Sequence, residues 1–62
     1  MTKAQDVLFA FNNGLEIQAY DFAMNNAVTI REASNCDHIR FDDNSEVKVI
    51  VTEDHEIMIM EA

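Results

Sequence analysis

The hydrophobic repeat of this 62-residue chain changes along its length, and the change limits the folds open to it. In residues 4–11 the apolar side chains recur every three or four positions, as they do on one face of a helix. From residue 38 onward they alternate with polar side chains, as they do on a half-buried strand. A chain of this length forms one domain. The sequence therefore predicts a single α+β domain over residues 1–62, with one or two N-terminal helices packed on a three-stranded antiparallel β-meander.

The N-terminal segment has the signals of a helix. Thr2 followed by Gln5 is a capping-box pattern, in which each side chain bonds a backbone amide of the first turn. Residues 12–14, with the sequence Asn-Asn-Gly, predict the end of the helix, because Gly readily takes the left-handed conformation that ends many helices. The apolar stripe between these signals consists of Ala4, Val7, Leu8 and Phe11.

Residues 15–24 predict a second helix, and the residues after it can be interpreted in two ways. Residues 27–31 either continue this helix through Ala33 or form a short strand, because residues 28–30 are β-branched. Helix continuation is the interpretation that we favour. The face of the second helix expected to be buried consists of Leu15, Ala19, Phe22 and Ala23.

Three alternating runs predict the strands of the meander. They occupy residues 38–42, 46–52 and 57–60. Residues 42–45 and 53–55 are rich in Asp, Asn, Ser and Glu, and the short polar side chains among them are typical of turns between strands. Alternation places one set of side chains toward the helices and the other set away from them.

The two faces of the predicted sheet lead to two expectations. The hydrophobic core is expected to include Leu8, Phe11, Phe22, Val49 and Ile57. The outward sheet face is more apolar than a solvated face needs to be, so we expect it either to be covered in part by residues 27–31 or to form an interface, as a homodimer or as a docking surface. The apolar residues of that expected interface are Ile50, Met58 and Met60.

The charge of the chain is strongly negative and unevenly placed. Twelve acidic residues stand against four Lys and Arg, which gives a net charge of −8 and a sequence pI of about 4.3. Residues 1–31 carry −1 and residues 32–62 carry −7. Such a surface repels free nucleic acid and anionic membranes and attracts a basic protein surface, although acidity can also serve solubility alone. The residues expected to bind a basic partner are Asp42, Asp43, Glu46, Glu53, Asp54, Glu56 and Glu61.

No catalytic, cofactor or metal motif is found in the sequence. Asp42, Asn44, Glu46 and Glu53 follow the spacing of a calcium loop, but Val47 occupies the position that normally needs Gly. One cysteine and two histidines do not complete a structural zinc site.

The lone cysteine also excludes an internal disulfide framework and, with no signal peptide visible, predicts a cytoplasmic protein. We therefore expect a non-enzymatic protein without a cofactor.

In size, acidity and its mix of short helices and hairpins, the whole chain resembles small phage-encoded inhibitors, among them anti-CRISPR proteins and other DNA mimics. The resemblance implies an acidic inhibitor that occupies a nucleic-acid-binding site on a defence or host protein. Carboxylates on a rigid sheet could imitate the charge array of duplex DNA, which is about one charge per 1.7 Å of axis. Two alternatives are an accessory or scaffold subunit that uses the apolar sheet face, and a winged-helix-like nucleic-acid binder, which the scarcity of Lys and Arg disfavours.

Overall fold

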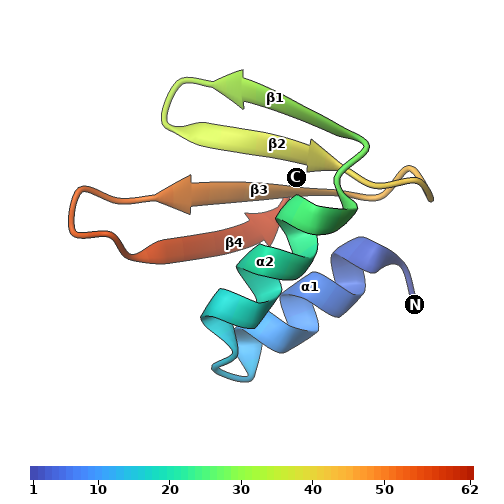
Figure 1. The fold of residues 1–62 in the computed structure, drawn as a ribbon, viewed down its shortest axis with the longest axis horizontal. Coiled ribbons are helices and arrows are strands. Elements are labelled where there is room, and N and C mark those ends of the chain that lie inside the picture. The colour runs from blue at the N-terminus through green and yellow to red at the C-terminus, as the bar shows by residue number, and fades with distance from the viewer.

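The computed structural model describes all of residues 1–62 as two helices followed by four strands (Figure 1). The strands form one antiparallel sheet in the order β1-β2-β3-β4, so each strand pairs with the next one along the chain. The predicted α+β class and the meander topology are confirmed. The elements are α1 (Lys3–Asn12), α2 (Glu16–Asn26), β1 (Thr29–Ala33), β2 (Cys36–Arg40), β3 (Glu46–Val51) and β4 (Ile57–Glu61).

Helix α1 begins and ends where its capping signals predict. The Thr2 hydroxyl accepts a hydrogen bond from the Gln5 amide at 3.1 Å, and the Gln5 side chain accepts one from the Thr2 amide at 2.8 Å. Gly14, in the linker to α2, has a φ of 85°, a conformation that favours glycine. Neither helix has the length and apolar character needed to cross a membrane.

The sheet has four strands rather than the three predicted, because residues 29–33 form β1 instead of continuing α2. The β-branched side chains at positions 28–30 favour extended backbone, and pairing with β2 satisfies the backbone groups of the segment. Asn35 closes the β1–β2 turn with a φ of 71°, which Asn tolerates better than most residues. Residues 27–31 therefore do not cover the outward sheet face, since β1 widens that face instead.

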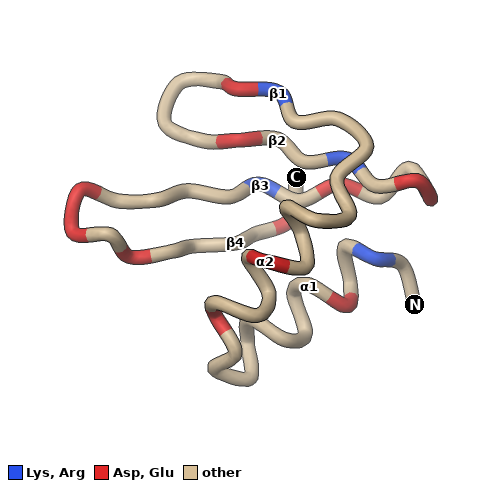
Figure 2. The backbone as a smooth tube through the Cα atoms, viewed as in Figure 1, with Lys and Arg blue, Asp and Glu red and all other residues tan.

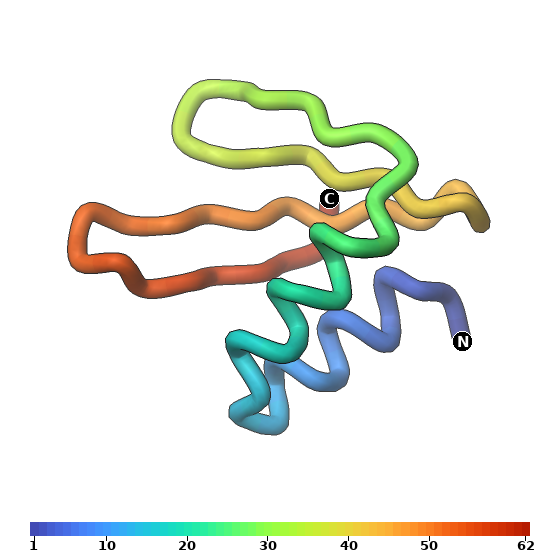
Figure 3. The backbone as a smooth tube through the Cα atoms, in the orientation of Figure 1, coloured from blue at the N-terminus to red at the C-terminus, as the bar shows by residue number.

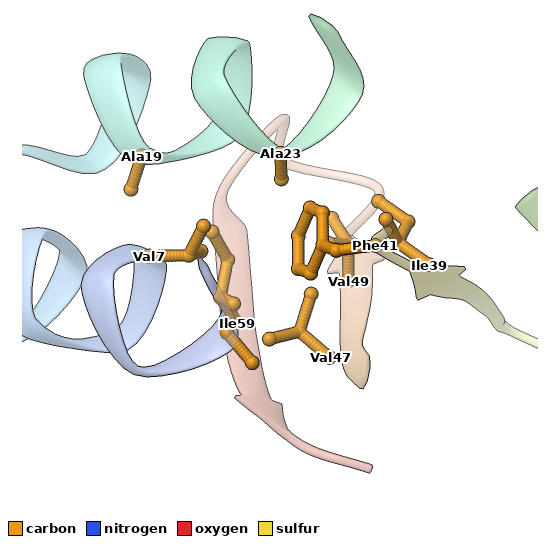
Figure 4. Close-up of a cluster of buried hydrophobic side chains, with 9 residues drawn as sticks. Val7, Ala19, Ala23, Ile39, Phe41, Val47, Val49 and Ile59 are labelled. Atoms are coloured by element: carbon orange, nitrogen blue, oxygen red, sulfur yellow. The ribbon is translucent and has the colours of Figure 1, made fainter. Parts of the chain in front are cut away.

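The hydrophobic core lies between the two helices and one face of the sheet (Figure 4). Val7 from α1 and Ala19 and Ala23 from α2 point toward side chains from the sheet. The largest fully buried side chain is that of Phe41, just after β2. The nine buried residues are Ala4, Val7, Ala19, Ala23, Ile39, Phe41, Val47, Val49 and Ile59.

The predicted core is confirmed at Val49 and wrong at Phe22. Leu8, Phe11 and Ile57 are partly buried and pack against the core. Phe22 is 39% exposed, because the buried stripe of α2 is the small pair Ala19 and Ala23. Successive residues of a helix are about 100° apart, so Phe22 lies on the flank of that stripe rather than on it.

Both helices contact β4, whereas β1 is exposed along its whole length. Figure 3 shows the free ends of the β1–β2 and β3–β4 hairpins extending beyond the helices. Two regions of the sheet are therefore left uncovered: the face turned away from the helices, and the hairpin ends on both faces.

Candidate protein-binding surface

The structure divides the seven predicted partner-binding carboxylates between opposite ends of the sheet (Figure 2). The turn between β2 and β3, the start of β3 and the end of β4 meet at one end. The turn between β3 and β4 lies at the other end. The first end carries Asp42, Asp43, Glu46 and Glu61, and the second carries Glu53, Asp54 and Glu56. The seven side chains therefore do not form one surface.

Asp42, Asp43 and Ser45 attach the β2–β3 turn to the start of α1, and we call this group the α1 clamp. The Lys3 ammonium lies 2.8 Å from an Asp42 carboxylate oxygen. The Lys3 amide donates to Asp43 Oδ2 at 2.8 Å, and the Ala4 amide donates to Ser45 Oγ at 3.1 Å. The first amides of a helix have no partner within the helix, so the clamp caps α1 from a distant part of the chain. Asp42 and Asp43 therefore have a structural role.

Hydrogen bonds hold Asp43 in its charged form. The Ser45 hydroxyl, the Lys3 amide and the Ser45 amide all donate to its carboxylate, and they lower its pKa from 3.8 to about 2. Since the pKa is lower in the folded state than in the unfolded chain, the ionised carboxylate stabilises the fold above about pH 4. This stabilisation is lost as the pH falls toward about 2 and Asp43 takes up a proton.

We expect an Asp43→Asn protein to unfold at a lower urea concentration than the wild type at pH 7. The difference between the two midpoints should narrow as the pH falls from about 4 to about 2, because the wild-type carboxylate is then neutralised. Asp54→Asn is the matched control, since the Asp54 side chain lies exposed in a turn. A midpoint difference that does not change over this range would contradict the role assigned to Asp43.

The end of the sheet opposite the α1 clamp carries only negative charge. It consists of residues 32–37, around the β1–β2 turn, and residues 51–57, around the β3–β4 turn; we call it the acidic hairpin end. These two segments contain no Lys or Arg. Glu32 and Asp37 are directly opposite each other in the β1–β2 register, a like-charge pair that costs stability. The five carboxylates of the acidic hairpin end belong to Glu32, Asp37, Glu53, Asp54 and Glu56.

Sequence reasoning missed Glu32 and Asp37, which were not among the predicted partner-binding residues. Their contribution depends on β1, since only a hairpin over residues 29–40 places the two side chains on one face at the end of the sheet. The sequence signal that could have predicted this hairpin is the Ser-Asn pair at positions 34–35, which fits a tight turn between two short strands.

A hollow of about 260 Å³ lies at the acidic hairpin end. Glu32, Asp37, Val49 and Val51 line it, and the strand register places all four on the face that the helices cover farther along the sheet. Two carboxylates beside two valines suit a Lys or Arg side chain, whose aliphatic stem packs on apolar groups while its charged head meets the carboxylates. The remaining lining residues are Ala33, Asn35 and Cys36.

The β3–β4 turn presents its carboxylates on an ordered backbone. The Thr52 amide donates to the Glu56 carbonyl at 2.9 Å, and the Glu56 amide donates to Thr52 Oγ1 at 3.1 Å. The His55 amide donates to the Thr52 carbonyl at 2.9 Å, and His55 has a φ of 63°. A fixed turn of this kind loses little conformational entropy when its charged side chains bind a partner.

The structure also places the residues of the expected apolar interface and those of the calcium-loop spacing. Ile50 and Met58 are directly opposite each other on the sheet face turned away from the helices, and Met60 lies opposite Lys48 on the same face. Met58 is 46% exposed. Asp42 and Glu53, the first and last positions of the calcium-loop spacing, lie beyond opposite ends of β3, and no three His, Cys, Asp or Glu side chains come together to hold a metal ion.

No protein-family model matches this chain, and no curated protein or solved structure matches it either.

Proposed function

We propose that this chain is a non-enzymatic binding protein whose acidic hairpin end occupies a basic surface of a partner protein. The observation that carries the proposal is the gathering of five carboxylates, with no Lys or Arg among them, on two adjacent hairpins. The five carboxylates at this end form no hydrogen bond or ion pair that holds the fold together, unlike Asp42 and Asp43 of the α1 clamp. A fixed array of one charge sign attracts the opposite charge over a distance set by the salt concentration.

The partner surface that best fits this array is one that binds nucleic acid. Such surfaces collect Lys and Arg side chains in the number needed to neutralise phosphates. The hollow beside Glu32 and Asp37 offers a place for one of these side chains to insert. The resemblance to small phage-encoded inhibitors supports the same mode of action, in which the chain competes with DNA or RNA for the groove of a defence or host protein.

A second candidate function is supported by the partly exposed apolar side chains on the sheet face turned away from the helices. The pair Ile50 and Met58, together with Met60, lies on a face that no element of the chain covers. An accessory or scaffold subunit would use such a face to dock on another protein or on its own copy.

The test of the first candidate is capture of partners on the immobilised chain from a bacterial lysate, followed by elution with a short DNA duplex. We expect nucleic-acid-binding proteins to be retained at 0.1 M salt and released by the duplex, because both ligands occupy one site. A control resin carries the variant Glu32→Gln/Asp37→Asn/Glu53→Gln/Asp54→Asn, and it should not retain the nucleic-acid-binding proteins. If both resins retain the same proteins, or if the duplex releases none of them, the proposed function is wrong.

A further inference from the structure

Three of the four basic side chains of this acidic protein lie on one face of its sheet. Ile39, Val47, Val49 and Ile59 face the helices, so their neighbours along each strand face away. We call this second face the open sheet face. Its basic residues are Arg31, Arg40 and Lys48, its acidic residue is Glu46, and its large apolar residues are Ile50, Met58 and Met60.

Arg31 and Lys48 have no acidic side chain opposite them in the sheet, whereas Arg40 lies opposite Glu46, and none of the three forms an ion pair. The single ion pair of the structure joins Lys3 and Asp42 in the α1 clamp. Arg40 is held by uncharged groups, with Nε 3.4 Å from Thr29 Oγ1 and Nη1 3.3 Å from Asn44 Oδ1. Arg31 and Lys48 are therefore the cations of this face that are left free to meet carboxylates from outside the molecule.

The strand register arranges these groups in two neighbouring rows. Arg31, His38, Lys48 and Met60 lie directly opposite one another across the four strands. Ile50 and Met58 lie in the next row, two residues along their strands. Two residues of a strand span about 6.6 Å, so a single helix, about 10 Å in diameter, covers both rows at once. A fitting ligand is therefore a helical surface that carries apolar and acidic side chains together.

The helices of this chain present such a surface. On α1, Phe9 is 65% exposed and lies three positions from Asp6. On α2, Ile17 is 66% exposed and lies four positions from Asp21. Residues at these spacings are neighbours on a helix surface, and Ile17 lies on the side of α2 opposite the buried Ala19. We call the surface formed by Asp6, Phe9, Ile17 and Asp21 the outer helix face; Glu16 is not part of it, because it lies in line with the buried Ala19 and Ala23.

We propose that the open sheet face of one copy binds the outer helix face of a second copy, in a head-to-tail association. The two faces lie on opposite sides of the molecule, since the helices pack on one face of the sheet only. Each carries apolar side chains that are at least partly exposed. The open sheet face has three basic residues and one acidic residue, whereas the charged residues of the outer helix face, Asp6 and Asp21, are both acidic. A contact between two different faces does not close on itself, so it extends from copy to copy. The proposal is independent of the acidic hairpin end, which neither face includes.

The size of the open sheet face sets the strength of this association. Four strands about 4.8 Å apart, each five residues long at about 3.3 Å per residue, cover about 300 Å². A stable interface buries about 800 Å² on each partner, so the association is weak and needs a high protein concentration. The net charge of −8 on each copy opposes it at low salt, and 0.15 M salt shortens the range of this repulsion to about 8 Å.

Sedimentation at 0.15 M salt, over protein concentrations up to the millimolar range, tests the proposal with a charge swap. We expect the wild type to grow in mean mass with concentration without stopping at two copies. Arg31→Glu/Lys48→Glu makes both faces acidic, and Asp6→Lys/Asp21→Lys makes both faces basic. Each variant alone should associate at least about tenfold more weakly than the wild type, because exposed attractive pairs become repulsive ones. An equimolar mixture of the two variants should recover the association.

Two controls separate the specific contact from a change in net charge. Glu53→Lys/Asp54→Lys has the same net charge as Asp6→Lys/Asp21→Lys, but its substitutions lie at the acidic hairpin end. It should therefore not restore association when it is mixed with Arg31→Glu/Lys48→Glu. Far-ultraviolet circular dichroism checks that each variant is folded. A wild type that stays monomeric throughout, a mass that levels off at a dimer, or a mixture that fails to recover association would each overturn the proposal.

Discussion

A Phe41→Ala protein is expected to be largely unfolded in the absence of denaturant. Phe41 is fully buried and is the largest side chain in the core. Removing a buried Phe side chain costs about 3–5 kcal/mol, and a core of this size supplies only about 3–5 kcal/mol of net stability. Urea unfolding followed by circular dichroism measures the change.

Phe9→Ala is the matched control, because it removes the same group from a side chain that is 65% exposed. It should shift the free energy of unfolding by less than about 0.5 kcal/mol, apart from the small gain in helix propensity that Ala brings. Equal losses of stability in the two variants would show that Phe41 does not have the central packing role described.

Val49→Asp is expected to have an effect of similar size by a different route. Val49 is buried in the centre of the sheet, where an unpaired carboxylate costs several kcal/mol or is forced to take up a proton. Thermal unfolding at pH 7 should show no cooperative transition for this variant.

Val51→Asp is the matched control. Val51 lies two residues farther along β3 and on the same face as Val49, but the helices do not cover it and its side chain is 52% exposed. Its melting transition should stay cooperative. An unchanged transition in Val49→Asp would contradict the assignment of β3 to the core.

The fold could be predicted from the sequence wherever a local signal and the tertiary packing agree. The capping box at Thr2 and the alternation around Val49 both correspond to features of the structure. The interpretation of residues 27–33 was wrong, because the periodic pattern there is short and the pairing with β2 decides the conformation. Phe22 was misplaced for a related reason: which side of α2 is buried depends on how closely Ala19 and Ala23 let the helix approach the sheet.

The charge pattern could be predicted in amount but not in arrangement. The sequence shows the excess of acidic residues in residues 32–62, but it does not reveal that Asp43 caps α1 from forty positions away or that Asp42 pairs with the Lys3 ammonium. Pairing across β1 and β2 brings Glu32 beside Asp37 and gathers Arg31 with Lys48 on the open sheet face. Strand register is a tertiary property, so the separation of acidic and basic surfaces appears only in the folded chain.

The distinction between a charged site and mere acidity requires variants of equal net charge. Glu53→Gln/Asp54→Asn removes two carboxylates from the acidic hairpin end. Glu46→Gln/Glu61→Gln removes two from the opposite end of the sheet, where both are exposed. Both variants have a net charge of −6, and neither touches the α1 clamp or the hydrophobic core.

The most direct test is therefore calorimetric titration of a captured partner with these two variants and the wild type at 0.1 M salt. Exposed charge pairs contribute up to about 1 kcal/mol each, so the loss of two carboxylates should weaken binding of the hairpin-end variant by up to about thirtyfold. The Glu46→Gln/Glu61→Gln variant should bind nearly as tightly as the wild type. Raising the salt to 0.3 M should reduce the difference, because the screening length shortens. Equal affinities for the two variants would contradict the account, since the acidity of this chain would then act only through its net charge.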